Sequence, residues 1–217
     1  MKCKLVAFDL DGVLVEEPSA WWSLHHAFGS FEASKENLLA YEMGAIDYPE
    51  FMRRDIRLWG SRTTYEVEDV LLKFTLSESA AEICDLLHQR GYELGIISAG
   101  IDILARAVSE KLRIDIWIAN GLQVDGQNCL TGEGIFRVEL KAKEKALNEL
   151  VKPLGVSLSD VVGVGDSKYD LSFMRACGAG VAFVRLGGSE RTHSWARGWI
   201  KIESLQDLPN TLSVIEE

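Results

Sequence analysis

The chain alternates between short apolar runs rich in β-branched residues and longer segments whose apolar positions have helical spacing. The apolar runs cover residues 5–8, 94–97, 114–119, 161–164 and 181–184. This alternation is typical of βαβ units, in which a helix returns the chain to a parallel sheet. We therefore expect an α/β fold with a doubly wound parallel sheet.

The clearest helix signal between two of these runs begins near Ser79. Ser79 and Glu82 have the spacing of a capping box, and apolar residues of one helical face follow them. Gly91 is a typical C-terminal stop. The pattern predicts a helix between Ser79 and Gly91.

Two segments depart from the alternation. Residues 16–75 carry only helical patterns and are interpreted as a helical insertion. Its helices are expected at residues 21–28, 38–43, 51–59 and 65–72. Residues 122–138 contain an Asp125-Gly126 turn between two short strands, which predicts a β-hairpin insertion.

Composition narrows the range of partners. Of the 217 residues, 47% are hydrophobic and 26% are charged, which is ordinary for a globular chain. The 23 basic and 33 acidic residues give a net charge of −10, and no basic cluster is longer than Arg53-Arg54. This balance argues against nucleic-acid and membrane surfaces, so we expect a small-molecule partner and leave the oligomeric state open.

The sequence also bears on location and redox state. No apolar run approaches the ~18 residues that span a bilayer, and the apolar segment before Asp9 is short for a signal peptide. We therefore expect a cytoplasmic protein. The four cysteines are far apart and form no CxxC motif, so we expect reduced thiols rather than a zinc site or disulfide framework.

Candidate chemistry begins directly after the first strand, at Asp9-Leu10-Asp11-Gly12. Ligands of open α/β sheets bind beyond the carboxyl ends of strands, and the strand period of two places Asp9 and Asp11 on one side. Two close carboxylates repel, and a hard cation such as Mg²⁺ relieves this with oxygen ligands. Gly12 permits a tight turn, and a plain acidic loop is the alternative interpretation.

Two further strand ends carry suitable residues. Ser98-Ala99-Gly100 follows the second run, where small residues let a hydroxyl and backbone N–H groups approach a phosphate. Asp166 and Asp170 follow the fourth run and can complete an oxygen-rich metal site. An aspartate at a helix start is also a common N-cap, which is the alternative for Asp170.

A lysine is expected to join these groups. The run Lys141-Ala142-Lys143-Glu144-Lys145 begins the helix before the fourth strand. A buried ammonium there would hold a carboxylate and an incoming phosphate. We expect one of the three lysines to point inward.

These four elements, in this order, resemble the four motifs of the haloacid dehalogenase superfamily of aspartate-nucleophile phosphatases. The helical insertion, the Ser98-Ala99-Gly100 element and the hairpin resemble its phosphoserine phosphatase branch. The resemblance implies a Rossmannoid catalytic core of residues 1–15 and 76–217. It also implies that residues 16–75 form a helical cap domain.

The resemblance assigns chemical roles to the residues that match the motifs. Asp9 would be the nucleophile and Asp11 the general acid and base. Lys143 would be the motif lysine, because Ala142-Lys143 best matches the family's Ala-Lys, and Lys145 is the second choice. The phosphate would be bound by Gly12, Ser98, Ala99 and Gly100. The cofactor would be Mg²⁺, with Asp9, Asp11, Asp166 and Asp170 at the metal site.

Substrate recognition is expected to come from the cap. The branch's cap glutamate falls at or near Pro18, so Glu17 or Glu16 is expected to replace it. Asp55 falls where the branch has a substrate-binding arginine, so Arg54 or Arg53 is expected to substitute. Tyr48 occupies an aromatic position of the branch.

The expected function is hydrolysis of a small phosphomonoester, with Mg²⁺ and an aspartyl-phosphate intermediate, as in phosphoserine phosphatases. One alternative is a general phosphatase of another small metabolite. A second is a receiver-type phosphoacceptor module, but that is shorter, has an adjacent acidic pair and carries no cap. A dehalogenase would need neither the acid Asp11 nor the metal site.

Overall fold

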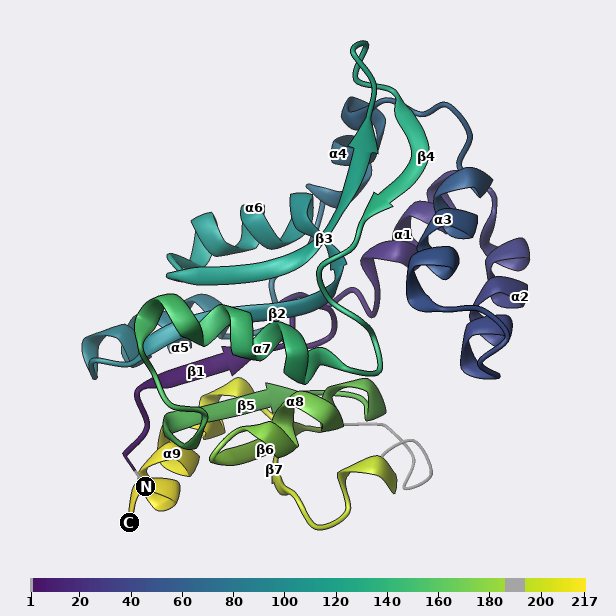
Figure 1. Ribbon diagram of the computed structural model, residues 1–217. Helices are drawn as coiled ribbons and strands as arrows, with labels where there is room; N and C mark the ends of the chain where they lie inside the picture. The colour runs from purple at the N-terminus through teal and green to yellow at the C-terminus, as the bar shows by residue number, and fades with distance from the viewer. Residues whose placement is uncertain (1, 186–193) are drawn as a thin grey trace.

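The computed structural model describes residues 2–185 and 194–217, and it has the expected α/β architecture (Figure 1). The strands of the described residues form one seven-stranded sheet in the order β4-β3-β2-β1-β5-β6-β7. Neighbouring strands are parallel except for the antiparallel pair β3 and β4. The strands are β1 (Leu5–Phe8), β2 (Glu93–Ile101), β3 (Ile116–Val124), β4 (Leu130–Ile135), β5 (Val161–Gly165), β6 (Ala179–Phe183) and β7 (Ile200–Ile202).

Helices cover both faces of this sheet. Helices α5, α6 and α9 lie on one face, and α7 and α8 lie together on the other (Figure 1). The α-helices of the described residues are α1 (Ala20–Ala27), α2 (Phe31–Glu42), α3 (Tyr48–Leu58), α4 (Thr64–Leu71), α5 (Ala80–Gln89), α6 (Asp102–Leu112), α7 (Lys143–Val151), α8 (Leu171–Ala176) and α9 (Leu208–Glu216). No helix of these residues is long and apolar enough to cross a membrane.

The four helices expected between β1 and α5 are all present, as α1 to α4. They lie to one side of the sheet, beside the hairpin of β3 and β4 (Figure 1). Helix α2 begins at Phe31, well before the predicted residue 38. The prediction began too late because the first turns of this helix are mostly polar and have little apolar periodicity. Helix α3 packs on β4, where Gly134 makes room for Met52.

Two local predictions need correction. Ser79 does not form a capping box: its φ is 62°, and its side chain makes no capping hydrogen bond. Instead, its Oγ accepts a bond from Gln206 Nε2 at 2.8 Å. A tertiary contact and a left-handed backbone therefore replace the cap at the start of α5.

The hairpin is confirmed, but its loop is not a simple Asp-Gly turn. The Asp125 carboxylate accepts bonds from the backbone N–H groups of Gln127 and Cys129, and the left-handed residue is Asn128, with φ 60°. The aspartate side chain therefore organises the loop.

The central strands place the chemistry at one edge. Strand β1 lies between β2 and β5, all three are parallel, and every residue of β1 and β5 is buried. Their carboxyl ends therefore meet, and the segments that follow Phe8, Ile97 and Gly165 come together.

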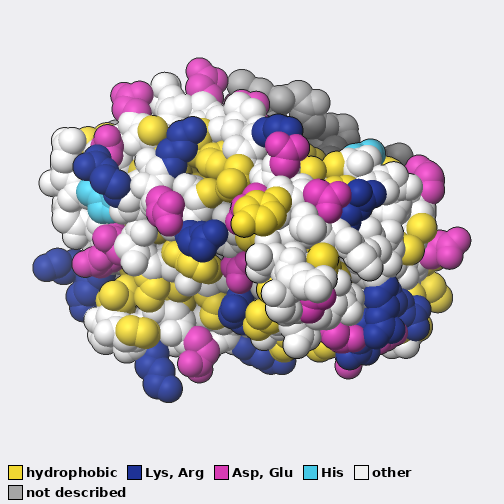
Figure 2. All heavy atoms as spheres, turned by 90° about the horizontal axis from the view of Figure 1, so that it is seen from above, with side chains coloured by type: hydrophobic (Ala, Val, Ile, Leu, Met, Phe, Trp, Pro, Cys, Tyr) yellow, Lys and Arg dark blue, Asp and Glu magenta, His cyan; other side chains and the backbone are white. Residues whose placement is uncertain are grey.

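On the face shown in Figure 2, basic and acidic side chains are interspersed and separated by small hydrophobic areas.

Candidate active site

Three aspartates form the centre of the site. Asp9 directly follows β1, and its N–H donates to Val164 O at 2.9 Å, which continues the pairing with β5. Carboxylate oxygens of Asp9, Asp166 and Asp170 all lie within 4.8 Å of one another. The predicted meeting of the first and fourth strand ends is therefore present.

Lys143 lies between two of these carboxylates. Its Nζ is 2.7 Å from Asp9 Oδ1 and 2.6 Å from Asp170 Oδ1, and the side chain is 3% exposed. Its backbone N–H donates to Ser172 Oγ, which fixes the start of α7. Lys145 is exposed, so the inward-pointing lysine is Lys143.

The second oxygen of Asp170 is held by its own loop. Asp170 Oδ2 accepts bonds from the N–H groups of Asp166 and Ser167 and from the Ser167 hydroxyl, at 2.8–3.1 Å. A Cβ at Gly165 would lie 2.3 Å from the Asp170 Cβ, so only glycine fits there. Asp170 thus caps the turn Lys168–Asp170 and also orients Lys143.

Asp11 is held at the start of the helical insertion. Its Oδ1 accepts a bond from the N–H of Ala20, the first residue of α1, at 2.9 Å. A Cβ at Gly100 would lie 2.6 Å from Asp11 Oδ2, so Asp11 lies directly against the second motif. The turn predicted at Gly12 is present, with φ 82°.

Burial changes the proton affinity of these groups. It raises the pKa of Asp11 to about 6, against the lowering effect of the Ala20 bond. Burial, followed by the charge of Asp170, raises the pKa of Asp166 to about 7 and that of Asp9 well above its usual value. Burial lowers the pKa of Lys143, but Asp170 and Asp9 outweigh this effect and raise it.

The three carboxylates therefore carry more negative charge than the neighbouring lysine balances. One ammonium opposes Asp9, Asp166 and Asp170, and their donor set contains only oxygen. Such a set suits a small hard cation, which would lower the raised carboxylate pKa values. The residues present fit Mg²⁺.

The second motif is joined to the insertion. Ser98 is buried, and its Oγ accepts a bond from Gly100 N–H at 2.9 Å. The carbonyl of Ala99 accepts bonds from Trp21 Nε1, Tyr48 Oη and Asn120 Nδ2 at 2.9–3.0 Å. Tyr48 is therefore next to the expected phosphate-binding segment.

The other expected recognition residues are engaged elsewhere. The Glu17 carboxylate accepts a bond from Thr75 N–H at 3.0 Å. Arg54 is 46% exposed and pairs with Glu50, one turn earlier in α3. The described contacts do not connect Arg54 with the aspartates, so its role stays a prediction.

Asp55, where the related phosphatases would have an arginine, belongs to a buried polar cluster instead. Asp55 is 2% exposed, accepts a bond from Asn37 at 2.8 Å and lies 3.2 Å from His25 Nε2. His25 Nδ1 in turn accepts a bond from Trp59 Nε1. This polar group joins α1, α2 and α3 inside the insertion.

A second contact joins the insertion to the fourth motif. The Glu42 carboxylate at the end of α2 accepts hydrogen bonds from the Tyr169 hydroxyl and from Lys168 Nζ. Lys141 Nζ donates to the carbonyls of Tyr41 and Glu42. The end of α2 is therefore docked directly over the loop that carries Asp166 and Asp170.

Arg185, which lies two residues beyond β6, was not among the predicted site residues. Its guanidinium donates to the carbonyls of Gly12 and Val15 and to Ser77 Oγ at 3.0–3.1 Å. A basic residue just beyond a strand, at the edge where ligands bind, is the signal that could have identified it.

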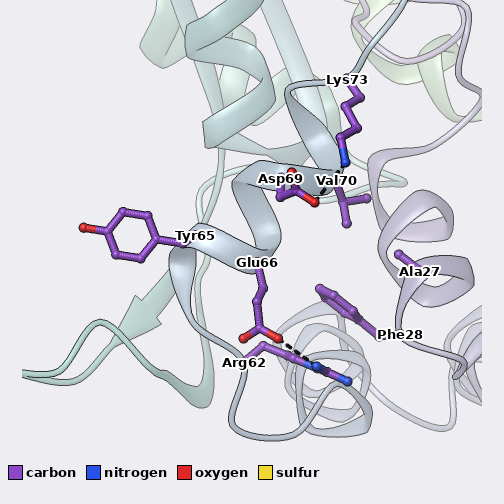
Figure 3. Close-up of a pocket in the computed structure, with 8 residues that line it drawn as sticks. All are labelled: Ala27, Phe28, Arg62, Tyr65, Glu66, Asp69, Val70 and Lys73. Carbon is purple, nitrogen blue, oxygen red and sulfur yellow. Dashed lines mark hydrogen bonds and ion pairs between the residues drawn. The ribbon is translucent and has the colours of Figure 1, made fainter.

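A separate surface cavity of about 570 Å³ lies between α1 and α4 (Figure 3). Its lining includes two ion pairs, Arg62 with Glu66 and Lys73 with Asp69. It shares no residue with the aspartate cluster, and its charges already neutralise one another. The chemistry therefore belongs to the strand ends.

Comparisons with known proteins agree with this geometry. The family model described as haloacid dehalogenase-like hydrolase matches residues 6–175. The phosphoserine phosphatase of Methanocaldococcus jannaschii is 34% identical over 185 residues, which are 84% of this chain and 86% of that protein.

Solved structures are similar over almost the whole chain. A substrate-bound phosphoserine phosphatase superposes with a TM-score of 0.79 at 26% identity, over 97% of this chain and 99% of the other. A phospho-aspartyl intermediate analogue of phosphoserine phosphatase has the same TM-score and coverage at 28% identity.

Proposed function

The chain belongs to the haloacid dehalogenase-like hydrolase family, and from this we propose that its aspartate cluster is a phosphatase site with Asp9 as the nucleophile. The chain is a phosphoric monoester hydrolase that forms an aspartyl-phosphate. One observation carries the assignment to Asp9: this buried carboxylate directly follows the central strand β1, and Lys143 holds only its Oδ1. The hydrolase family and phosphatase relatives favour an enzyme over a receiver module.

In the first step, Asp9 Oδ2 attacks phosphorus in line with the leaving oxygen. An acyl-phosphate bond forms as the ester P–O bond breaks. Lys143 stays protonated, orients Asp9 and balances the phosphate charge. The hydroxyl of Ser98 and the N–H groups of Ala99, Gly100 and Gly12 bind the phosphate oxygens.

Two of these N–H groups must exchange partners to bind phosphate. The N–H of Gly100 donates to Ser98 Oγ, and that of Gly12 donates to the carbonyls of Val15 and Glu17. The present acceptors lie within five residues of Gly100 or Gly12 along the chain. A phosphate oxygen can therefore replace them without movement of a strand or helix.

Asp11 transfers the protons. Burial raises the pKa of Asp11, which favours the protonated form that donates to the leaving alkoxide in the first step. Its carboxylate then takes a proton from the hydrolytic water. The Ala20 N–H bond and the contact with Gly100 keep the carboxyl group beside the reacting atoms. The different environments of the two carboxyl groups thus give Asp9 the role of nucleophile and Asp11 that of acid and base.

Mg²⁺ fits the oxygen donors of Asp9 and Asp166, with the Asp11 segment adjacent. When bound, it supplies positive charge that reduces repulsion between carboxylate and phosphate. Both oxygens of Asp170 already accept hydrogen bonds, one from Lys143 and the other from Ser167. Asp170 therefore supports the metal site without being required as a direct ligand.

Residues 16–75 are the cap domain of this proposal, and residues 1–15 and 76–217 are the core. Contacts of Tyr48 with Ala99 and of Glu42 with Tyr169 support a cap that closes over the aspartates. A closed cap excludes water and reads the leaving group.

Phosphoserine is the leading substrate of this proposal, with Glu17 recognising its amine and Arg54 its carboxylate. Both side chains must leave their present partners, Thr75 N–H and Glu50, to do so. The alternative is a small phosphomonoester without these groups, which needs only Tyr48 and the phosphate site.

A comparison of phosphoserine with phosphoglycolate separates these substrates. If Glu17 binds the amine, Glu17→Gln should remove a preference of ~1–3 kcal/mol in kcat/KM for phosphoserine. Glu16→Gln is the matched control, because Glu16 is adjacent and exposed. Loss of the preference in the Glu16 variant alone would reassign the role, and equal rates on both substrates in the unmodified protein would indicate a general phosphatase.

A further inference from the structure

We propose that Arg185 is a positioning residue that holds the Asp11 segment and the two cap linkers in their working arrangement. The proposal rests on the proposed function, because it concerns the acid role of Asp11. It assigns Arg185 no contact with substrate.

The first support is the set of acceptors. Nε and Nη2 of Arg185 donate to Gly12 O at 3.1 and 3.0 Å, and Nη2 donates to Val15 O at 3.1 Å. Gly12 directly follows Asp11, so a guanidinium bond to its carbonyl limits rotation of the segment that carries the acid.

The second support is the position of Ser77. Ser77 Oγ accepts a bond from Arg185 Nη2 at 3.0 Å, and Ser77 N–H donates to Leu14 O at 2.9 Å. The N–H of Glu16 similarly donates to Thr75 O. The outgoing and returning linkers of residues 16–75 therefore run side by side, and Arg185 bonds to both.

The third support is the contact between this turn and the fourth motif. A Cβ at Gly12 would lie 2.1 Å from Asp166 Oδ2, so the turn lies directly against that carboxylate. The backbone N–H groups of Asp9 and Asp166 keep partners of their own, Val164 O and Asp170 Oδ2. Loss of the Arg185 bonds to Gly12 O should therefore displace the Asp11 segment rather than Asp9 or the fourth motif.

The chemistry of arginine suits this role. Its planar guanidinium presents several donors in a fixed fork, whereas lysine presents one ammonium on a flexible stem. Arg185 uses Nε and Nη2 together on a single carbonyl and extends Nη2 to two further acceptors. A lysine at this position would keep the charge and lose the fork.

The consequence depends on the leaving group. An acid that is out of position matters most when the leaving oxygen needs a proton, and least when it leaves as a stable anion. Phenyl phosphate and p-nitrophenyl phosphate differ in this respect, because phenol is as weak an acid as the tyrosine side chain, with a pKa of about 10, and nitrophenol is much stronger.

The test measures single-turnover formation of the aspartyl-phosphate from these two esters. Arg185→Met should slow the reaction of phenyl phosphate by about 30-fold, part of the ~10²–10⁴-fold effect of a positioned acid. The reaction of p-nitrophenyl phosphate should slow by less than about threefold. Arg185→Lys should show the same selective loss, which keeps the proposal testable if the methionine variant does not fold.

Arg175→Met is the matched control, since Arg175 is exposed on α8, and it should leave both rates unchanged. Equal slowing of both esters in the two Arg185 variants, or no slowing of either, would overturn the positioning role. If the unmodified protein forms no aspartyl-phosphate from these esters or from phosphoserine, the proposed function itself fails, so the two failures are distinguishable.

Discussion

At the scale of single residues, Asp170 shows how one side chain serves both folding and chemistry. It closes a capping box with Ser167 and pairs with the buried Lys143. Its removal would leave Lys143 paired with Asp9 alone and would leave the N–H groups of Asp166 and Ser167 without their acceptor. Both losses are costly in a buried site. The same residue should therefore control both stability and the orientation of Lys143.

We expect Asp170→Ala to lower the free energy of unfolding by about 3–5 kcal/mol, the range for a broken buried pair. Denaturant titration measures this. Asp207→Ala is the control, because Asp207 closes a similar capping box with Ser204 on the surface. Its loss should cost only about 0.5–2 kcal/mol, as for other caps. Equal losses in the two variants would contradict a structural role for the Lys143 pair.

The residues of the site were predictable to different degrees. Asp9 and Asp166 directly follow parallel strands, and Asp11 comes two residues after Asp9. The order of elements along the sequence is therefore enough to bring them to one edge of the sheet. The motif match at Ala142-Lys143 favoured Lys143 over Lys145, and in the structure Lys143 is buried and Lys145 is exposed. Arg185 was missed because its partners are two backbone carbonyls and the Ser77 hydroxyl, as far as 173 residues away, which a sequence pattern does not show.

At the scale of elements, local patterns predicted most strands and helices, and tertiary contacts caused the errors. The first run matches β1, and β2 extends past its predicted end to Ile101 through the second motif. Ser79 has the spacing of a cap, but its contact with Gln206 and its left-handed backbone prevent that role. Such contacts are invisible to a spacing rule.

The end of α2 provides a prediction at this scale. Tyr169→Phe removes the hydroxyl that donates to Glu42, and a hydrogen bond is worth about 0.5–1.5 kcal/mol. Hydrogen exchange at residues 39–44 should therefore become about 2–10-fold faster, with little change in global stability. Tyr65→Phe, at a 71% exposed tyrosine, should change neither. Unchanged exchange in the Tyr169 variant would contradict the docking of α2 on the fourth motif.

The same contact should depend on pH. The bond from Tyr169 holds the pKa of Glu42 below its usual value. A depressed carboxylate pKa stabilises the contact above the unfolded value of about 4.3, and this stabilisation is lost as the pH falls through the folded value. Protection factors at residues 39–44, which correct for the intrinsic pH dependence of amide exchange, should therefore fall only on acidification below this range.

At the scale of the whole molecule, the acidic cluster should couple metal binding to stability. A ligand that binds only the folded chain stabilises it by about 2.7 kcal/mol at one hundred times its Kd, which corresponds to about 5–10 °C in Tm for a chain of this size. Mg²⁺ should produce such a shift. Asp166→Asn should reduce it, and sodium chloride at equal ionic strength should not reproduce it.

An equal shift in the Asp166 variant, or one given by Zn²⁺ but not by Mg²⁺, would contradict the oxygen-only site. The Mg²⁺-dependent shift in Tm also tests the division of the chain into core and cap. A cation held by residues after β1 and β5 stabilises the core, so the shift should not require the cap residue Tyr48.

The most direct test of the account is chemical trapping of the intermediate. Protein mixed with p-nitrophenyl phosphate and Mg²⁺ is quenched in acid, digested and analysed by mass spectrometry. The account predicts a hydroxylamine-sensitive phosphoryl group on the peptide that contains Asp9, absent in Asp9→Asn and increased in Asp11→Asn, in which hydrolysis of the acyl-phosphate lacks its base. Turnover without such a group, or a phosphoryl group on another residue, would contradict the assignment of Asp9 as the nucleophile.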